Sequence, residues 1–204
     1  MNDQRIAILT DTGTNVPADF VAAHDIRQVP LMVNYSDGAF RSEVDITTDE
    51  VIDRFATEIP TTSLPSPNDI KVALDKAHAD GYEKAVFVTI SSGLSATNAT
   101  VELVAGQMED FPVEVVDTKS IGVAAGLVVM AAARMVEGGV PFDQLKGKLT
   151  LLSADTRVYF TVKDLYYLRH GGRINEATYR LGSVLNLKPV FYCDAEGKYA
   201  TVKK

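Results

Sequence analysis

Short runs of apolar residues, each ending in polar turn-forming residues, mark the strands expected along most of the chain. Residues 5–10, 84–90 and 112–116 are such runs and predict buried strands. Residues 28–34 predict a further strand, and the Asp37-Gly38 pair after it predicts a hairpin turn. The run at residues 84–90 (KAVFVTI) is the clearest of them.

Apolar residues at helical spacing separate these strands. In the first such stretch, Asn15 is the expected N-cap and Pro17 lies in the first turn. Residues 60–67 hold three prolines among hydroxyl residues and predict an irregular loop rather than a helix or a central strand. The alternation of strands and helices predicts an α/β fold with a mostly parallel sheet and flanking helices. The expected helices are at about residues 16–22, 48–58, 68–79, 97–108, 120–137 and 142–153.

The pattern changes after about Ser153. Residues 157–162 predict a strand, and residues 163–169 predict a short helix broken by Gly171-Gly172. Two more strands are expected at residues 187–193 and 198–202, around a turn at residues 194–197. We therefore expect an α/β domain over residues 1–153 and the beginning of a second α/β domain over residues 154–204.

Composition and charge narrow the classes of function. The chain has 20 Lys+Arg against 27 Asp+Glu, a net charge of −7, so it lacks the basic surplus of a nucleic-acid-binding protein. A single cysteine, Cys193, excludes an internal disulfide framework and a multi-thiolate metal site. The three histidines are far apart in the sequence, so we expect no metal and no cofactor.

No segment has the pattern of an export signal or a membrane span. The longest run made only of apolar residues and glycine covers residues 121–133, a length that suits a buried helix rather than a bilayer span. The N-terminus reaches Asp11 after a stretch too short for the core of a signal peptide. We therefore expect a cytoplasmic protein without stable membrane insertion.

Four hydroxyl-rich segments follow or adjoin the predicted strands. They are residues 11–14, 61–66, 91–97 and 117–120. Ligands of an open α/β sheet bind outside the carboxyl ends of its strands, and helix N-termini there add free N–H donors. Together these donors predict a site for a small anion, and a carboxylate fits them better than a polyphosphate. Taken singly, such residues are more often helix caps and turn formers.

A serine-dependent hydrolase or transferase is the alternative that the same loops leave open. Residues 93–97 (GLSAT) approach the G-x-S-x-G turn that carries a nucleophilic serine, here Ser95, although the fifth residue is threonine. Such a serine needs a base within hydrogen-bond reach. His24 and His78 lie in or near helical segments, so His170 is the loop candidate. Neither phosphate-loop signature, G-x-x-x-x-G-K-[ST] or G-x-G-x-x-G, is present.

Six segments carry distinctive motifs: residues 11–17 (DTGTNVP), 62–66 (TSLPS), 91–97 (SSGLSAT), 116–118 (VDT), 165–174 (LYYLRHGGRI) and 187–190 (LKPV). In this order they resemble the motifs of DegV proteins. Three positions differ, since Leu64, Ala96 and Asn15 stand where that family usually has Gln, Gly and Asp.

The resemblance implies a cytoplasmic, bacterial, non-catalytic protein of two α/β domains that binds one long-chain fatty acid in an apolar tunnel. It places the carboxylate contacts on Thr62 and Ser95. Ser63, Ser92 and Thr97 would be supporting hydrogen-bond donors to the same carboxylate. The resemblance also implies a partner, a fatty acid kinase that converts the bound carboxyl group to an acyl phosphate for phospholipid metabolism.

Arg173 has two interpretations by the same resemblance. It is either an exposed cation that faces a partner or the nascent acyl phosphate, or an arginine that anchors its own loop. The apolar helix at residues 123–136 is either a tunnel wall or ordinary core. DegV chains usually continue further, so the resemblance implies a chain shortened at the C-terminus with an incomplete second domain. An unpaired strand edge there would favour homo-oligomers.

Overall fold

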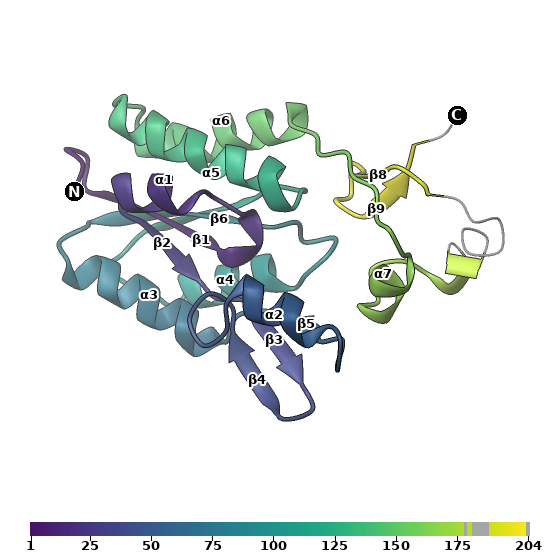
Figure 1. Cartoon of the computed structure of the whole chain (residues 1–204). Coiled ribbons are helices and arrows are strands. Elements are labelled where there is room, and N and C mark those ends of the chain that lie inside the picture. The colour runs from purple at the N-terminus through teal and green to yellow at the C-terminus, as the bar shows by residue number, and fades with distance from the viewer. Residues whose placement is uncertain (178, 181–187, 203–204) are drawn as a thin grey trace.

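Four parallel strands form the central sheet of the computed structural model, which describes residues 1–177, 179–180 and 188–202 (Figure 1). The strand order is β2-β1-β6-β7, and Leu9 pairs with Arg27 on one side and Phe87 on the other. The strands predicted at residues 5–10, 84–90 and 112–116 are confirmed. Their observed bounds are β1 (Ile6–Asp11), β2 (Ile26–Val29), β6 (Lys84–Thr89) and β7 (Val113–Asp117).

Helices cover both faces of this sheet, as Figure 1 shows. Ile6 and Ile8 of β1 pack toward α1 (Ala18–Ala23), α5 (Gly122–Glu137) and α6 (Phe142–Asp155). Ala7 and Leu9, on the opposite face, pack toward α3 (Pro67–Ala79) and α4 (Thr97–Ala105). Continuous apolar strands are expected when both faces are covered. The predicted α/β fold with a parallel sheet and flanking helices is confirmed.

Helix α5 belongs to this core. Val128, Val129 and Ala132 have no exposed surface and pack with the sheet residues Val86 and Val88. Of the two interpretations of the apolar helix, tunnel wall and ordinary core, the structure therefore shows the core. No helix in the described part of the chain is long and apolar enough to cross a bilayer.

A second, antiparallel sheet corrects the strand predicted at residues 28–34. That segment forms the end of β2 and then β3 (Met32–Tyr35), which lies in another sheet, between β4 (Gly38–Arg41) and β5 (Thr61–Ser63). The chain leaves the first sheet at Pro30, which has no N–H to donate, and the Leu31 N–H donates to the Thr12 hydroxyl at 3.0 Å. The predicted hairpin is confirmed, but Ser36 and Asp37 form its turn, because Gly38 already pairs with Tyr35 in β4.

Two other expectations about the first half change in detail. Asn15 is not the N-cap of α1: it adopts φ 48° and ends a short 3₁₀ helix, η1 (Thr12–Thr14), and α1 begins after Pro17. Asparagine tolerates this left-handed conformation better than most residues. The helix expected at about residues 48–58 is shorter: α2 (Thr48–Arg54) begins with a capping box, in which the Glu50 N–H donates to the Thr47 hydroxyl, and ends at Arg54.

The last quarter of the chain contains α7 (Tyr166–His170) and an antiparallel pair, β8 (Phe191–Cys193) and β9 (Tyr199–Thr201). The prediction of a strand at residues 157–162 is wrong, because only Phe160 pairs there, in a single bridge to Phe191. The expected strands and turn at residues 187–202 correspond to β8, β9 and the turn between them. Leu187, also part of the LKPV motif, lies outside the described residues.

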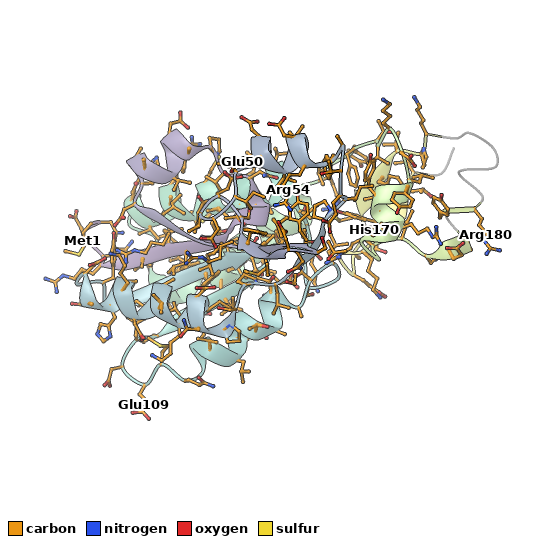
Figure 2. All side chains as sticks on the ribbon, turned by 60° about the horizontal axis from the view of Figure 1, so that its bottom comes forward. Met1, Glu50, Arg54, Glu109, His170 and Arg180 are labelled. Atoms are coloured by element: carbon orange, nitrogen blue, oxygen red, sulfur yellow. The ribbon has the colours of Figure 1, made fainter. Side chains whose placement is uncertain are left out.

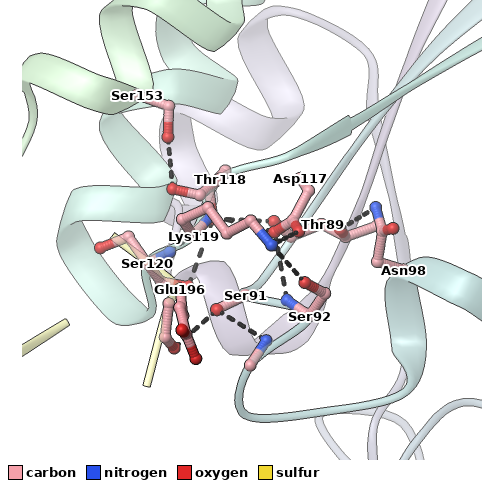
Figure 3. A network of polar contacts seen from close by, with 12 residues as sticks. Thr89, Ser91, Ser92, Asn98, Asp117, Thr118, Lys119, Ser120, Ser153 and Glu196 are labelled. Atoms are coloured by element: carbon pink, nitrogen blue, oxygen red, sulfur yellow. Dashed lines mark hydrogen bonds and ion pairs between the residues drawn. The ribbon is translucent and has the colours of Figure 1, made fainter. Parts of the chain in front are cut away.

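The turn between β8 and β9 docks on the loop that follows β6. The Ser91 hydroxyl donates to the Gly197 carbonyl at 2.7 Å, and the Gly93 N–H donates to the Ser91 hydroxyl at 3.0 Å. Figure 3 shows this contact within a wider polar network that includes Glu196. The docking brings the C-terminal hairpin next to the carboxyl edge of the central sheet.

Candidate functional site

The loop between β6 and α4 carries two hydroxyls in direct contact. The N–H groups of Leu94 and Ser95 both donate to the Ser91 carbonyl at 3.1 Å, which folds the loop into a tight turn. The Ser95 and Thr97 hydroxyls are 2.8 Å apart, and the Thr97 N–H donates to the Ser95 hydroxyl at 3.3 Å. Thr97 is fully buried and Ser95 is half-buried, so Ser95 is the accessible member of the pair.

Strand β5 presents Thr62 and Ser63 at the edge of the antiparallel sheet. Ser63 is opposite Met32, and its hydroxyl accepts a hydrogen bond from the Asn34 amide at 3.2 Å. Thr62 is exposed, and its hydroxyl bonds to no described residue. This leaves the Thr62 hydroxyl available to a ligand.

A small cavity of about 230 Å³ is lined both by β5 and by the loop between β6 and α4. Thr62, Ser63, Ser95 and Arg173 all line it, although they come from three separate parts of the sequence. The other residues that line the cavity are mostly apolar. They are Leu31, Pro60, Thr61, Ile90, Leu94, Ile121, Tyr167, Leu168, Gly171 and Tyr199. We call it the head-group cavity.

Arg173 is half-buried in the wall of the head-group cavity rather than exposed. Its side chain donates to the Leu94 carbonyl at 3.4 Å and to the Gly171 carbonyl, so it does anchor its loop. No described carboxylate forms an ion pair with it. A cation that is partly withdrawn from water without a countercharge favours an anionic ligand.

Ser92 and Thr97 do not line the head-group cavity. Ser92 instead joins the network of Figure 3: its N–H donates to Asp117 at 3.1 Å, and its hydroxyl accepts from Lys119 at 2.7 Å. Burial acts to raise the pKa of the Asp117 carboxyl, but the hydrogen bonds from Ser92 and Lys119 outweigh it and hold that pKa below its usual value. Lys119 is itself paired with Asp117 at 2.9 Å.

A larger groove of about 1070 Å³ adjoins the head-group cavity. Leu94, Arg173 and Tyr199 line both spaces, and we call this shared boundary the neck. Sequence reasoning missed Tyr199, because no motif or periodicity connects it with the hydroxyl loops. Other residues that line the groove are Gly93, Tyr159, Gly172, Ile174, Asn175, Phe191, Tyr192, Lys198, Ala200, Thr201 and Val202.

Each of the three histidines has a partner other than Ser95. His24 is 2.5 Å from Glu137, and the His78 ring stacks on Phe111. His170 stacks on Tyr166 and lies at the end of the molecule opposite Met1 (Figure 2). The Ser95 hydroxyl therefore contacts another hydroxyl and no base among the described residues.

Asp11 fastens the end of β1 to the end of β6, beside the head-group cavity. Its carboxylate accepts from the N–H groups of Gly13 and Ile90, each at 2.9 Å, and Ile90 lines the cavity. Burial raises the pKa of this fully buried carboxyl to about 6, although both hydrogen bonds act to lower it. Burial therefore disfavours the charged form of Asp11 in the folded protein.

Asp11 should make the folded protein less stable as the pH rises from about 4 to about 6. Its folded pKa of about 6 exceeds the usual 3.8, so the folded state holds a proton that the unfolded state releases. The resulting stabilisation is fully present below pH 3.8, is lost by about pH 6, and is on the order of 3 kcal/mol. Urea unfolding of the wild type and Asp11→Asn across this range would measure it, since the variant lacks the titration. Parallel stability curves would contradict the raised pKa.

Comparisons with known proteins agree with this architecture. The family model described as "Uncharacterised protein, DegV family" matches residues 5–204. A DegV domain-containing protein of Clostridium perfringens is 35% identical over 201 residues, which are 98% of this chain and 72% of the relative.

Two solved structures are similar over nearly the whole chain. A fatty-acid-binding DegV family protein from Thermus thermophilus has a TM-score of 0.86 and 33% identity, over 98% of this chain and 71% of that one. A stearic-acid-binding protein from Eubacterium ventriosum has a TM-score of 0.87 and 30% identity, over 97% and 70%. The resemblance carried by the sequence motifs is therefore confirmed, and the chain belongs to the DegV family.

Proposed function

We propose that this protein binds one long-chain fatty acid, with the carboxylate in the head-group cavity and the acyl tail in the larger groove. The observation that carries the proposal is that the same three residues line both a small cavity with hydroxyl and guanidinium donors and a larger groove with room for an acyl chain. At about 230 Å³ the head-group cavity is smaller than pockets for drug-sized ligands, about 300–1,000 Å³, whereas the groove is at the top of that range.

The tail would supply most of the affinity. Each buried CH₂ group contributes about 0.8 kcal/mol, so a chain of sixteen carbons gains far more than a few hydrogen bonds give. The polar groups have a different task, because an unpaired carboxylate is costly to withdraw from water. The hydroxyls of Thr62 and Ser95 would donate to it, Ser63 and Thr97 would support them, and the half-buried Arg173 would balance its charge.

Relatives support this assignment. The solved proteins from Thermus thermophilus and Eubacterium ventriosum are fatty-acid-binding proteins of similar structure. The alternative, a hydrolase or transferase with Ser95 as nucleophile, is less well supported, because the hydroxyl of Thr97 cannot serve as the base that such a serine needs.

We further propose that the protein has no turnover of its own and presents the bound fatty acid to a fatty acid kinase. Thr62 is exposed, so a carboxylate held there would be accessible to a partner from the side of β5. Phosphorylation would add negative charge beside Arg173, which has no described acidic partner. This cation would then stabilise the acyl phosphate as well as the carboxylate.

The same proposal treats residues 1–153 as the domain that holds the head group and residues 154–204 as the beginning of a second domain. In its support, β8 and β9 pair with each other in a sheet of their own and not with the four-stranded sheet. The ligand would then lie between the two.

Denaturing extraction of the purified protein, followed by lipid mass spectrometry, tests the fatty-acid proposal. We expect a nearly stoichiometric long-chain fatty acid. A protein that unfolds cooperatively, contains no lipid and takes up no added palmitate would contradict the proposal, and ester substrates should then be tested for hydrolysis.

A further inference from the structure

Tyr199 is the aromatic residue of the neck between the head-group cavity and the groove. It lies at the start of β9, opposite Cys193, and it lines both spaces together with Leu94 and Arg173. A ligand that extends from one space into the other must pass this side chain. Tyr199 is therefore placed to contact the ligand where its polar end meets its tail.

Two neighbouring rings fix the position of the Tyr199 ring. Phe160 meets it edge to face, with ring centroids 5.2 Å apart, and the Phe191 centroid lies 6.4 Å away. Phe160 and Phe191 are themselves stacked at 5.5 Å. Such aromatic packing orients the ring without using its hydroxyl. A phenylalanine at this position would keep the packing and lose only the polar atom.

The hydroxyl of Tyr199 is a free donor. It bonds to no described residue, although the side chain is half-buried. Burial, with a smaller contribution from Cys193, raises the pKa of Tyr199 to about 12, and the nearby Arg173 only partly opposes this rise. The hydroxyl therefore keeps its proton at neutral pH and can donate it to an acceptor in the neck.

We propose that Tyr199 donates a hydrogen bond to the carboxylate of the bound fatty acid and thereby selects free acids over esters of the same chain length. The inference rests on the proposed function, because it assumes that an acyl ligand crosses the neck. The selection follows from charge: a hydrogen bond to a carboxylate is roughly twice as strong as one to a neutral ester oxygen. Arg173, on the same wall, acts in the same direction.

Binding of palmitate and of methyl palmitate to wild type and Tyr199→Phe tests this role. Delipidated protein would be titrated with each lipid and the bound fraction measured by native mass spectrometry. We expect Tyr199→Phe to weaken palmitate binding about tenfold and to change methyl palmitate binding less than about twofold. The matched control is Tyr166→Phe, which removes the hydroxyl of a half-buried tyrosine that lines neither the groove nor the head-group cavity. It should change neither affinity.

Other outcomes separate this inference from the proposed function. If wild type binds palmitate and Tyr199→Phe binds it equally well, Tyr199 is not a donor to the carboxylate and the fatty-acid proposal stands. An equal loss of affinity for the acid and the ester would also overturn the inference, since the hydroxyl would then act on the shape of the neck. If wild type does not bind palmitate, both proposals fail.

Discussion

Replacing Thr62 and Ser95 together by alanine is expected to weaken fatty-acid binding by about a hundredfold or more while the protein stays folded. Each hydroxyl would donate a hydrogen bond to a charged group, and such bonds contribute about 1.5–3 kcal/mol apiece. Because 1.4 kcal/mol corresponds to a factor of ten, losing both predicts at least this loss of affinity. The buried tail and Arg173 would retain some ligand, so the variant should bind weakly rather than not at all.

The measurement is the lipid content of each purified variant, together with its affinity for added palmitate. A matched control is the double variant Ser92→Ala with Thr100→Ala, which removes two hydroxyls of the same segment. Ser92 bonds to Asp117 and Lys119, and the Thr100 hydroxyl donates to the Ala96 carbonyl, so neither lines the head-group cavity. Equal lipid retention by the test and control variants would contradict the assigned carboxylate contacts.

The second large effect is expected from Gly93→Ala, which should separate the C-terminal hairpin from the loop after β6. An added Cβ would lie 2.5 Å from the Glu196 carbonyl oxygen and 2.7 Å from the Gly197 carbonyl carbon. Both obstacles are backbone atoms, so no side-chain rotation relieves the overlap. The turn must move away, which would break the bond from Ser91 to Gly197.

We expect this substitution to destabilise the protein by about 1–3 kcal/mol and to reduce lipid binding. The hairpin carries Tyr199, so its displacement opens both the neck and the groove. Urea unfolding and lipid content would measure the two effects. The control is Gly147→Ala in α6, where an added Cβ meets nothing within 4 Å. That variant should be unchanged or more stable by up to about 1 kcal/mol, because alanine favours the helix. Unchanged stability and binding in Gly93→Ala would refute the close docking of the turn.

Periodicity and turn chemistry were sufficient to predict most elements of the central sheet and its helices. The apolar runs at residues 84–90 and 112–116 are local signals, and both form strands of the central sheet. The single strand predicted at residues 28–34 was wrong, because this strand-like sequence continues through Pro30 while the chain passes from the central sheet to the antiparallel sheet. Strand pairing depends on distant residues, so a sequence window cannot show such a change. The strand predicted at residues 157–162 was wrong for the same reason, since only Phe160 pairs there, in a single bridge to Phe191.

The candidate site likewise combines residues found from the sequence with residues that only the structure placed. Thr62 and Ser95 were found from motifs, and the structure places them on one cavity. Ser92 belongs to the same motif but faces another network, because successive residues of a tight turn point in different directions. The sequence left two interpretations of Arg173, an exposed cation or an arginine that anchors its loop. The structure supports the anchor, because the loop folds back and the Arg173 backbone N–H donates to the Leu168 carbonyl at 2.9 Å. This turn brings the guanidinium into the wall of the cavity.

The sequence by itself determined the α/β fold, the family and the edge of the sheet where polar groups collect. The reason is that alternating strands and helices give parallel strands, whose carboxyl ends meet at one edge. Only the tertiary structure decided which side chains share the head-group cavity and what separates it from the groove. Tyr199 reaches this site because the turn at Gly197 docks against Ser91 and Gly93, a contact between segments far apart in the chain. No spacing or periodicity records such a contact, since it depends on how two backbones fit together in space.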